Sequence, residues 1–255
     1  MGATDTAVGE PRVFGGRARL GLIVPTTNTV NEAEWQQLAT PAITFHTMRM
    51  PLHAADTGEA TVPGPLRSAL AALVDAEPSS IAYGCTAGSM VTPVETLPHA
   101  MAEVSGVPCT STAEAIVQAL RRLGARRIAV ASPYHEALND QWRAFLEACD
   151  FEVTAVRGLG IGAGGAAEFK RIARLPLAEV RRHAEATFAA APAEALLLSC
   201  TDLPTLPLLA PLEAALGVPV VSSNSATLWR ALALAGVEAD LAGAGSLLQR
   251  RDAAG

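Results

Sequence analysis

Two cysteines, each followed by a threonine, stand just beyond short apolar runs in different halves of the chain. Cys85-Thr86 comes after the run Ser-Ile-Ala-Tyr, and Cys200-Thr201 comes after the run Ala-Leu-Leu-Leu. Both runs have the length and composition of buried strands. Ligands of open α/β sheets bind beyond the carboxyl ends of strands, so we expect both Cys-Thr pairs at a ligand-binding edge.

Paired thiols at such an edge predict proton transfer or attack on carbon. N–H groups at the start of a helical turn stabilise an anion, so they lower the pKa of a thiol there. Two facing thiols could serve as base and acid on opposite faces of a substrate, or one could attack carbon while the other moves a proton. Thr86 and Thr201 would supply donors to a carboxylate or an enediolate. A cysteine can instead be unreactive and pack as a small buried apolar residue, and this is our interpretation of Cys109 and Cys149.

Alternating strand-like and helix-like segments must position these residues. Apolar runs typical of strands occupy residues 19–24, 43–46, 80–83, 127–131, 152–156, 195–198 and 219–221. Helix-like segments occupy residues 65–74, 112–123, 136–149, 177–191 and 225–235. This alternation predicts an α/β fold with mostly parallel sheets covered on both faces. No Gly-x-Gly-x-x-Gly follows the first strand, which disfavours a dinucleotide-binding fold.

The chain also repeats itself. Four landmarks recur in the same order: a strand ending in proline, a tryptophan nine or ten residues later, a Cys-Thr pair, and a Gly-Val-Pro that leads into a strand ending in a Ser/Thr cluster. Each cluster is expected to cap the helix that follows it. The repeat predicts two pseudo-symmetric α/β halves, 19–125 with Cys85 and 126–250 with Cys200, with both Cys-Thr turns at their interface. A flexible N-terminus at 1–18 and a tail at 251–255 complete the predicted organisation.

Composition narrows the class of protein. Half of the 255 residues are hydrophobic and 17% are charged, so the chain can bury a large core. A net charge of −6, 4% aromatic residues and no basic stripe argue against nucleic-acid binding. No apolar run reaches the roughly 18 residues of a membrane span, and no apolar signal core is visible, so we predict a cytoplasmic protein. Alanine- and leucine-rich helix faces make a homo-oligomer our expectation.

Cofactor chemistry is not expected either. The single lysine, Lys170, lies in a charged stretch that resembles an exposed helix start, which argues against a pyridoxal-phosphate enzyme. The four cysteines form no Cys-x-x-Cys pair and have no histidine at metal-ligand spacing, so zinc is not predicted. A chain of this length does not need a disulfide framework.

Five segments form a recognisable set: 21–29, 84–89, 124–134, 197–202 and 217–223. Over residues 19–245 they resemble the aspartate/glutamate racemase superfamily, in particular its maleate cis-trans isomerase and arylmalonate decarboxylase branch. This resemblance implies two α/β halves that each contribute a cysteine. Cys85 matches the nucleophile of the isomerases, which the decarboxylases lack. Cys200 matches the proton donor that both groups share.

The same resemblance implies the groups that bind the substrate. Asn28 matches an asparagine, and Tyr134 a tyrosine, that hold carboxylate oxygens. Thr27, beside Asn28, and Ser223, in the second Ser/Thr cluster, complete the predicted binding residues together with the two threonines named above. The isomerases place a further asparagine in the loop corresponding to 159–168, and this chain has none there. The glycine-rich residues 160–165 are instead expected to form a flap over the cleft.

We therefore predict a cofactor-independent isomerase that acts on a small (di)carboxylate in the manner of maleate isomerase. Two alternatives share the fold: a two-base racemase of amino acids or hydantoins, and an arylmalonate-type decarboxylase. A third alternative, a non-catalytic carboxylate-binding protein, leaves the paired thiols without a purpose. Asn28 could also simply cap a helix, as could Asn224, and Tyr134 could be a packed aromatic residue.

Overall fold

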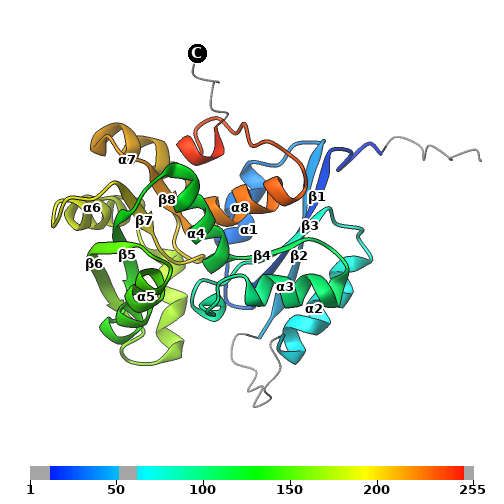
Figure 1. The fold of residues 1–255 in the computed structure, drawn as a ribbon, viewed down its shortest axis with the longest axis horizontal. Coiled ribbons are helices and arrows are strands. Elements are labelled where there is room, and N and C mark those ends of the chain that lie inside the picture. Colours follow the sequence, from blue (N-terminus) through cyan, green and yellow to red (C-terminus); the bar gives the residue numbers. More distant parts are fainter. Residues whose placement is uncertain (1–11, 52–61, 250–255) are drawn as a thin grey trace, which may run out of the picture.

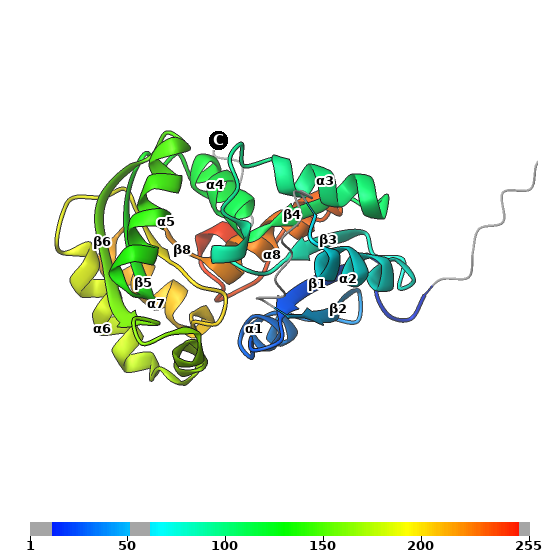
Figure 2. The same cartoon turned by 90° about the horizontal axis from the view of Figure 1, so that it is seen from below.

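The computed structural model describes residues 12–51 and 62–249, which form two lobes side by side (Figures 1 and 2). Each lobe is built on a four-stranded parallel sheet, ordered β2-β1-β3-β4 in the first and β6-β5-β7-β8 in the second. The predicted α/β fold with two similar halves is confirmed. Among the described residues, no helix is both long enough and apolar enough to cross a membrane.

The strands are β1 (Ala18–Pro25), β2 (Ile43–Met50), β3 (Ser80–Tyr83), β4 (Cys109–Ser111), β5 (Arg127–Tyr134), β6 (Glu152–Ile161), β7 (Ala195–Leu198) and β8 (Val220–Ser222). The α-helices are α1 (Asn31–Gln37), α2 (Gly64–Val74), α3 (Thr96–Ser105), α4 (Thr112–Leu123), α5 (Glu136–Ala148), α6 (Leu177–Phe188), α7 (Leu209–Leu216) and α8 (Ser223–Leu234). A 3-10 helix, η2, covers Ala166–Arg174.

The central strands bring the two Cys-Thr pairs to one edge of each sheet. Every residue of β3 and β7 is buried, because helices cover both faces of a parallel sheet. In register, Ile23 of β1 lies opposite Tyr83 of β3, and Ala131 of β5 lies opposite Leu198 of β7. The strand ends that precede the cysteines therefore lie beside the ends of β1 and β5.

The repeated sequence landmarks mark helix ends. Gly106 ends α3 with φ 70°, and Gly217 ends α7 with φ 71°. This left-handed conformation favours glycine, which explains why Gly-Val-Pro recurs before β4 and β8. The Ser/Thr clusters then start the next helices, since the Ser111 hydroxyl accepts from Glu114 N and Ser222 forms a capping box with Ser225.

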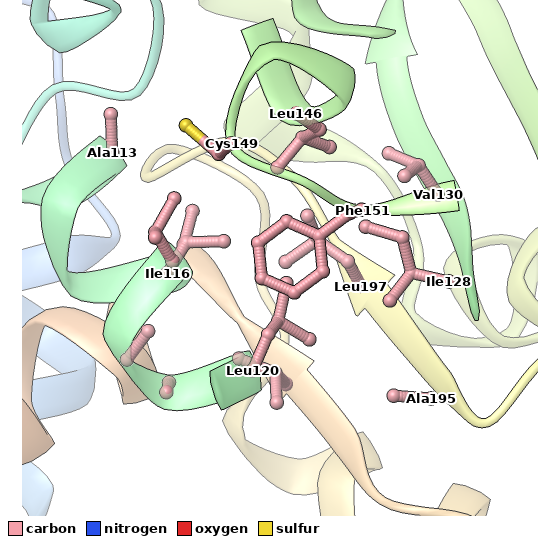
Figure 3. Close-up of a cluster of buried hydrophobic side chains, with 14 of the residues drawn as sticks. Ala113, Ile116, Leu120, Ile128, Val130, Leu146, Cys149, Phe151, Ala195 and Leu197 are labelled. Atoms are coloured by element: carbon pink, nitrogen blue, oxygen red, sulfur yellow. The ribbon is translucent and has the colours of Figure 1, made fainter. Parts of the chain in front are cut away.

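The two lobes exchange helices. Helix α4 follows β4 of the first sheet but packs on the second, where Ile116 and Leu120 face Phe151 and Leu197 (Figure 3). Helix α8 follows β8 of the second sheet but packs on the first, where Leu232 joins the core of β1 and α1. The opposite faces are covered by local helices: α2 and α3 in the first lobe, α6 and α7 in the second.

The exchanged helices also contact each other between the lobes (Figure 1). Arg230 Nε of α8 donates to Glu114 Oε1 of α4 at 3.1 Å, and the Thr110 hydroxyl donates to Glu114 Oε2 at 2.6 Å. Burial raises the pKa of Glu114, and these two donors act against that shift. Because α4 and α8 are exchanged, neither lobe is one continuous stretch of sequence. The predicted boundary at 125/126 therefore divides the two copies of the sequence repeat and does not separate the two packed lobes.

Candidate active site

A cavity of about 70 Å³ lies where the ends of β1, β3, β5 and β7 meet between the lobes. The structure brings seven of the eight predicted site residues to its wall: Thr27, Asn28, Cys85, Thr86, Tyr134, Cys200 and Thr201. Larger hollows of about 290 and 340 Å³ lie elsewhere, and none of the described residues lining them is a cysteine. The convergence of seven predicted residues marks the smaller cavity as the candidate active site.

Cys85 lies in the tight turn that follows β3. Its Sγ accepts a hydrogen bond from Gly88 N at 3.3 Å and is hydrogen-bonded to the Tyr83 phenol. Its carbonyl accepts from the Ser89 hydroxyl at 2.6 Å, and Ser89 Oγ in turn accepts from Ala113 N at the start of α4. Burial raises the pKa of the Cys85 thiol, and the two donors to sulfur lower it by less.

Cys200 occupies a strained position at the end of β7. Its φ of 122° is a region that side chains rarely adopt, and such strain costs about 1–3 kcal/mol. The backbone N–H of Cys200 donates to Ser223 Oγ at 3.0 Å, and its Sγ accepts from Asp202 N at 3.4 Å. Burial raises the pKa of the Cys200 thiol to about 12, against the Tyr134 and Asp202 N–H hydrogen bonds. The N–H groups of the two turns lower the pKa of the thiols, as we expected, but burial raises it by more.

Hydroxyl and amide groups connect the two cysteine turns across the lobes. Asn28 Nδ2 donates to Thr201 Oγ1 at 3.1 Å, and the Thr201 hydroxyl donates to Gly84 O at 3.2 Å. Thr86 Oγ1 lies 3.0 Å from Ser223 Oγ. Ser223 is buried outside the cavity wall, so it contacts Thr86 and Cys200 rather than the cavity itself.

Asn28 both orders the start of α1 and lines the cavity. Its Oδ1 accepts from Val30 N at 3.1 Å and from Asn31 N at 3.0 Å, where α1 begins. Its Nδ2 faces Thr201 at the cavity, and an amide nitrogen carries two N–H donors. One side chain thus orders the start of α1 and presents an amide to the cavity.

Tyr134 is fixed at the end of β5 by a small buried network. Asn139 Nδ2 donates to Tyr134 O at 3.1 Å, Tyr134 N donates to Ser132 Oγ at 3.2 Å, and Ser132 Oγ donates to Asn139 Oδ1. A Cβ at Gly158 would lie 2.1 Å from Tyr134 O, so only glycine fits there. The Tyr134 phenol is hydrogen-bonded to Cys200 and Thr86, and burial raises its pKa.

The cavity lining combines one acidic side chain with an apolar wall. Asp202 lines it, its Oδ1 accepts from Thr29 N at 2.8 Å, and burial raises its pKa to about 6. Its apolar wall consists of Pro25, Ala87, Leu138, Phe169 and Ile172. Of the described residues that line the cavity, none is arginine, lysine or histidine.

Sequence reasoning missed this apolar wall. Phe169 and Ile172 lie in η2, within the charged stretch that we interpreted as an exposed helix start. Their i, i+3 spacing on a helical turn was the available signal, since it places both on one face. The neighbouring glycine-rich residues are held by Glu168, whose Oε2 accepts from Gly162 N at 2.9 Å.

Three other residues considered from the sequence do not line the cavity. Asn224 lies in α8, and its Nδ2 donates to Glu34 Oε2 of α1 at 2.7 Å. Ser222, rather than Asn224, caps α8. Cys109 and Cys149 are buried in separate apolar clusters, as expected for small core residues.

Comparison with known proteins gives consistent relatives. The family model described as arylmalonate decarboxylase matches residues 20–248. A maleate isomerase of Nocardia farcinica is 31% identical over 253 residues, which span 94% of this chain and 98% of that protein. An arylmalonate decarboxylase of Bordetella bronchiseptica is 41% identical over 138 residues, about half of either chain (54% and 55%).

A solved structure of the Nocardia farcinica maleate cis-trans isomerase, a cysteine-to-serine variant with a covalently bound succinylcysteine intermediate, superposes with a TM-score of 0.76. It is 27% identical and covers 92% of this chain and 99% of its own. Two parallel-sheet lobes with a thiol from each at their interface define an enzyme of the aspartate/glutamate racemase-like superfamily. The chain belongs to the arylmalonate decarboxylase family. The predicted branch and the prediction of an enzyme are confirmed, and the maleate isomerase relatives support the isomerase class.

Proposed function

We propose that the chain is a cofactor-independent cis-trans isomerase of a small unsaturated dicarboxylate, with maleate as the reference substrate. The observation that carries this proposal is the presence of one thiol from each lobe, Cys85 and Cys200, on a single small cavity. A decarboxylation needs a single proton donor, whereas reversible addition to a double bond uses a nucleophile and a proton donor. The succinylcysteine intermediate of the Nocardia farcinica relative supports such an addition.

In the proposed reaction the Cys85 thiolate adds to one alkene carbon and forms a C–S bond. The π electron pair moves to the neighbouring carbon, where the adjacent carboxylate group stabilises it as an enediolate. Cys200, which burial keeps protonated, donates its proton to that carbon. Rotation about the new single bond follows. Cys200 then removes a proton, the C–S bond breaks and the trans alkene leaves, which restores both sulfur atoms to their starting forms.

Neutral donors would hold the carboxylates, because no described cavity residue carries a positive charge. We assign this task to Asn28, Thr27, Thr86, Thr201 and Tyr134, and assign Ser223 to the orientation of Thr86 and the Cys200 backbone. Backbone and side-chain donors aimed at developing charge are an effective way to stabilise an enediolate in a desolvated site. The apolar wall of Phe169 and Ile172 favours substrates with an apolar substituent, so a methyl-substituted maleate belongs among the test compounds.

Proton NMR in deuterium oxide tests the proposal directly. The panel is maleate, methyl-substituted maleate, D- and L-aspartate, D- and L-glutamate, and phenylmalonate. Conversion of a cis alkene to the trans isomer without added cofactor is the expected result. Complete inactivity towards both alkenes, at enzyme concentrations that convert another member of the panel, contradicts the proposal.

Removal of either thiol should abolish isomerisation. Cys85→Ala and Cys200→Ala are each expected to lower kcat by at least about 10³-fold, because each residue performs a separate step of one reaction. Cys149→Ala is the matched control, since Cys149 lies in an apolar cluster outside the cavity, and it should retain activity. Full activity in either cavity variant would remove the mechanism.

A two-base racemase is the second candidate, since two thiols from opposite lobes could also face one stereocentre from both sides. Loss of an α-proton signal from an amino acid in deuterium oxide would establish it and make Cys85 a base. The decarboxylase relative keeps a third chemistry open, which loss of carbon dioxide from phenylmalonate would reveal. Cytoplasmic location and homo-oligomerisation stay predictions.

A further inference from the structure

The chain contains two tyrosines, and each of them contacts one of the cavity thiols. Tyr134 lines the cavity beside Cys200. Tyr83 is also buried, but it does not line the cavity, because it ends β3 and packs among apolar residues of α2 and α3. Its phenol therefore reaches Cys85 from the protein interior rather than from the substrate side.

The turn after β3 brings this phenol to the sulfur. Gly84 N donates to Ile23 O at 2.7 Å, which continues the pairing of β3 with β1. Cys85 N donates to Tyr83 O at 3.1 Å, so the chain turns at Gly84. A Cβ at Gly88 would lie 2.6 Å from Tyr83 Oη and 3.0 Å from Cys85 Sγ. The missing side chain at Gly88 thus leaves the space in which the hydroxyl and the sulfur approach each other.

Two donors converge on Cys85 Sγ: the Gly88 N–H at 3.3 Å and the Tyr83 O–H. A thiolate can accept both hydrogen bonds, whereas a neutral thiol must find an acceptor for its own hydrogen. We propose that Tyr83 is a positioning residue that orients Cys85 and stabilises its thiolate from behind the cavity wall. This inference rests on the proposed function only in treating Cys85 as the reactive thiolate.

The surroundings of the two thiols differ in charge. The titratable groups that face Cys85 are Tyr83 from β3, Tyr134 from β5 and Cys200 beyond β7. Cys200 has the additional carboxylate of Asp202 beside it, which raises the pKa of the Cys200 thiol. The Tyr83 hydrogen bond acts in the opposite direction and lowers the pKa of Cys85. Tyr134 lowers the pKa of Cys200 in the same way, and burial raises the pKa of both thiols, so the carboxylate of Asp202 is the charge that distinguishes the two sites.

The test measures alkylation of Cys85 by iodoacetamide across pH, followed by peptide mass spectrometry of the full chain without substrate. Tyr83→Phe keeps the ring and removes the hydroxyl. We expect the rate at pH 7 to fall about tenfold and the midpoint of the pH profile to rise by about one unit, as for loss of a hydrogen bond to a charged group. Ser105→Ala is the matched control, because the Ser105 hydroxyl lies 3.5 Å from the thiol of Cys109, and Cys85 should then react as in the wild type.

An unchanged rate and midpoint in folded Tyr83→Phe overturns the inference. If that variant does not fold, 3-fluorotyrosine in place of both tyrosines supplies more acidic phenols in a nearly unchanged shape. The Cys85 midpoint should then move to lower pH, and an unmoved midpoint again overturns the inference. Because alkylation needs no turnover, a shifted midpoint in a protein that converts no alkene upholds the inference while the proposed function fails.

Discussion

Asp202 is the one carboxylate among the described residues of the cavity wall, and it lies beside a thiol that the proposed reaction needs in its protonated form. Its carboxylate also accepts from Thr29 N, so it connects the turn after β7 to the turn after β1. Desolvation nonetheless dominates and raises its pKa to about 6. A carboxyl group in such a place couples the stability of the site to pH.

That coupling has a definite sign. The ordinary pKa of an aspartate is 3.8, so as pH rises from 4 to 6 the unfolded chain releases this proton while the folded chain holds it. The stability that Asp202 contributes is full below pH 4 and is lost as pH rises through 6. The free energy of unfolding of Asp202→Asn, relative to that of the wild type, should therefore rise by about 1–2 kcal/mol between pH 4 and pH 6. This is less than the full pKa shift of Asp202 implies, because Asp202 is partly exposed to solvent. Urea unfolding at pH 4, 5, 6 and 7 measures the difference, and a constant difference contradicts the assignment.

The thiols and hydroxyls that line the cavity were predictable from single residues, and the apolar wall was not. Cys85 and Cys200 stand at strand ends in two copies of one pattern, which is a signal that a single sequence can carry. Phe169 and Ile172 have no such pattern around them, because their segment is charged and helical and only the fold turns it over the cavity. The conformation of Cys200, with φ 122°, has no sequence signature either, since side chains rarely adopt it.

At the scale of elements, a single buried carboxylate connects α1, α8 and the segment that precedes α7. Glu34 of α1 accepts from Leu206 N at 2.7 Å, from the Thr205 hydroxyl at 3.2 Å, and from Asn224 Nδ2 of α8 at 2.7 Å. Burial raises the pKa of Glu34, and these donors lower it by less. The contacts to Thr205 and Leu206 lie on the segment between Cys200 and α7, so they help to set the direction in which the cysteine turn leaves β7.

Glu34→Gln should destabilise the protein by about 1–3 kcal/mol, because the new NH₂ group would face N–H donors and leave them without an acceptor. Equilibrium unfolding in urea measures this loss. Glu185→Gln is the matched control: Glu185 makes an exposed i, i+4 pair with Arg181, which contributes little to stability. An equal, small effect in both variants would show that Glu34 is not the connection we infer.

Element boundaries followed from the sequence where local chemistry sets them. Residues 112–123 were predicted as a helix and form α4, since Ser111 begins it and Gly124 follows it with φ 74°. The strands β5 and β6 extend beyond their predicted ends, to Tyr134 and Ile161, because their last residues pair with each other rather than with apolar neighbours. Tertiary pairing of this kind is not visible in a local apolar run.

At the scale of the whole molecule, the exchange of α4 and α8 makes the lobes depend on each other. Leu232 belongs by sequence to the second half, yet it is 1% exposed in the core of the first lobe. Sequence periodicity gave each of these helices one apolar face, but it carried no information about which sheet that face would cover. Only the observed packing shows that the two halves of the sequence repeat do not coincide with the two packed lobes.

Leu232→Ala should therefore destabilise both lobes at once, by about 2–5 kcal/mol. Trp35 lies in the core of the first lobe and Trp142 in the core of the second, so versions of the protein that keep one of these tryptophans report on each lobe by fluorescence. We expect coincident urea transitions in the parent and in the variant. A transition at Trp35 that precedes the one at Trp142 would mean that the lobes unfold independently.

The helix exchange also has a consequence for synthesis on the ribosome. A chain is made from its N-terminus at roughly 5–20 residues per second, and domains usually fold as they emerge. Here the first sheet is complete in sequence at Ser111, but the helix that covers one of its faces begins only at Ser223. For on the order of 10 s, that apolar face has only α1 as native cover while the polypeptide is still attached to the ribosome. We therefore expect the nascent first lobe to need protection by chaperones during translation, although the finished protein has two lobes of ordinary domain size.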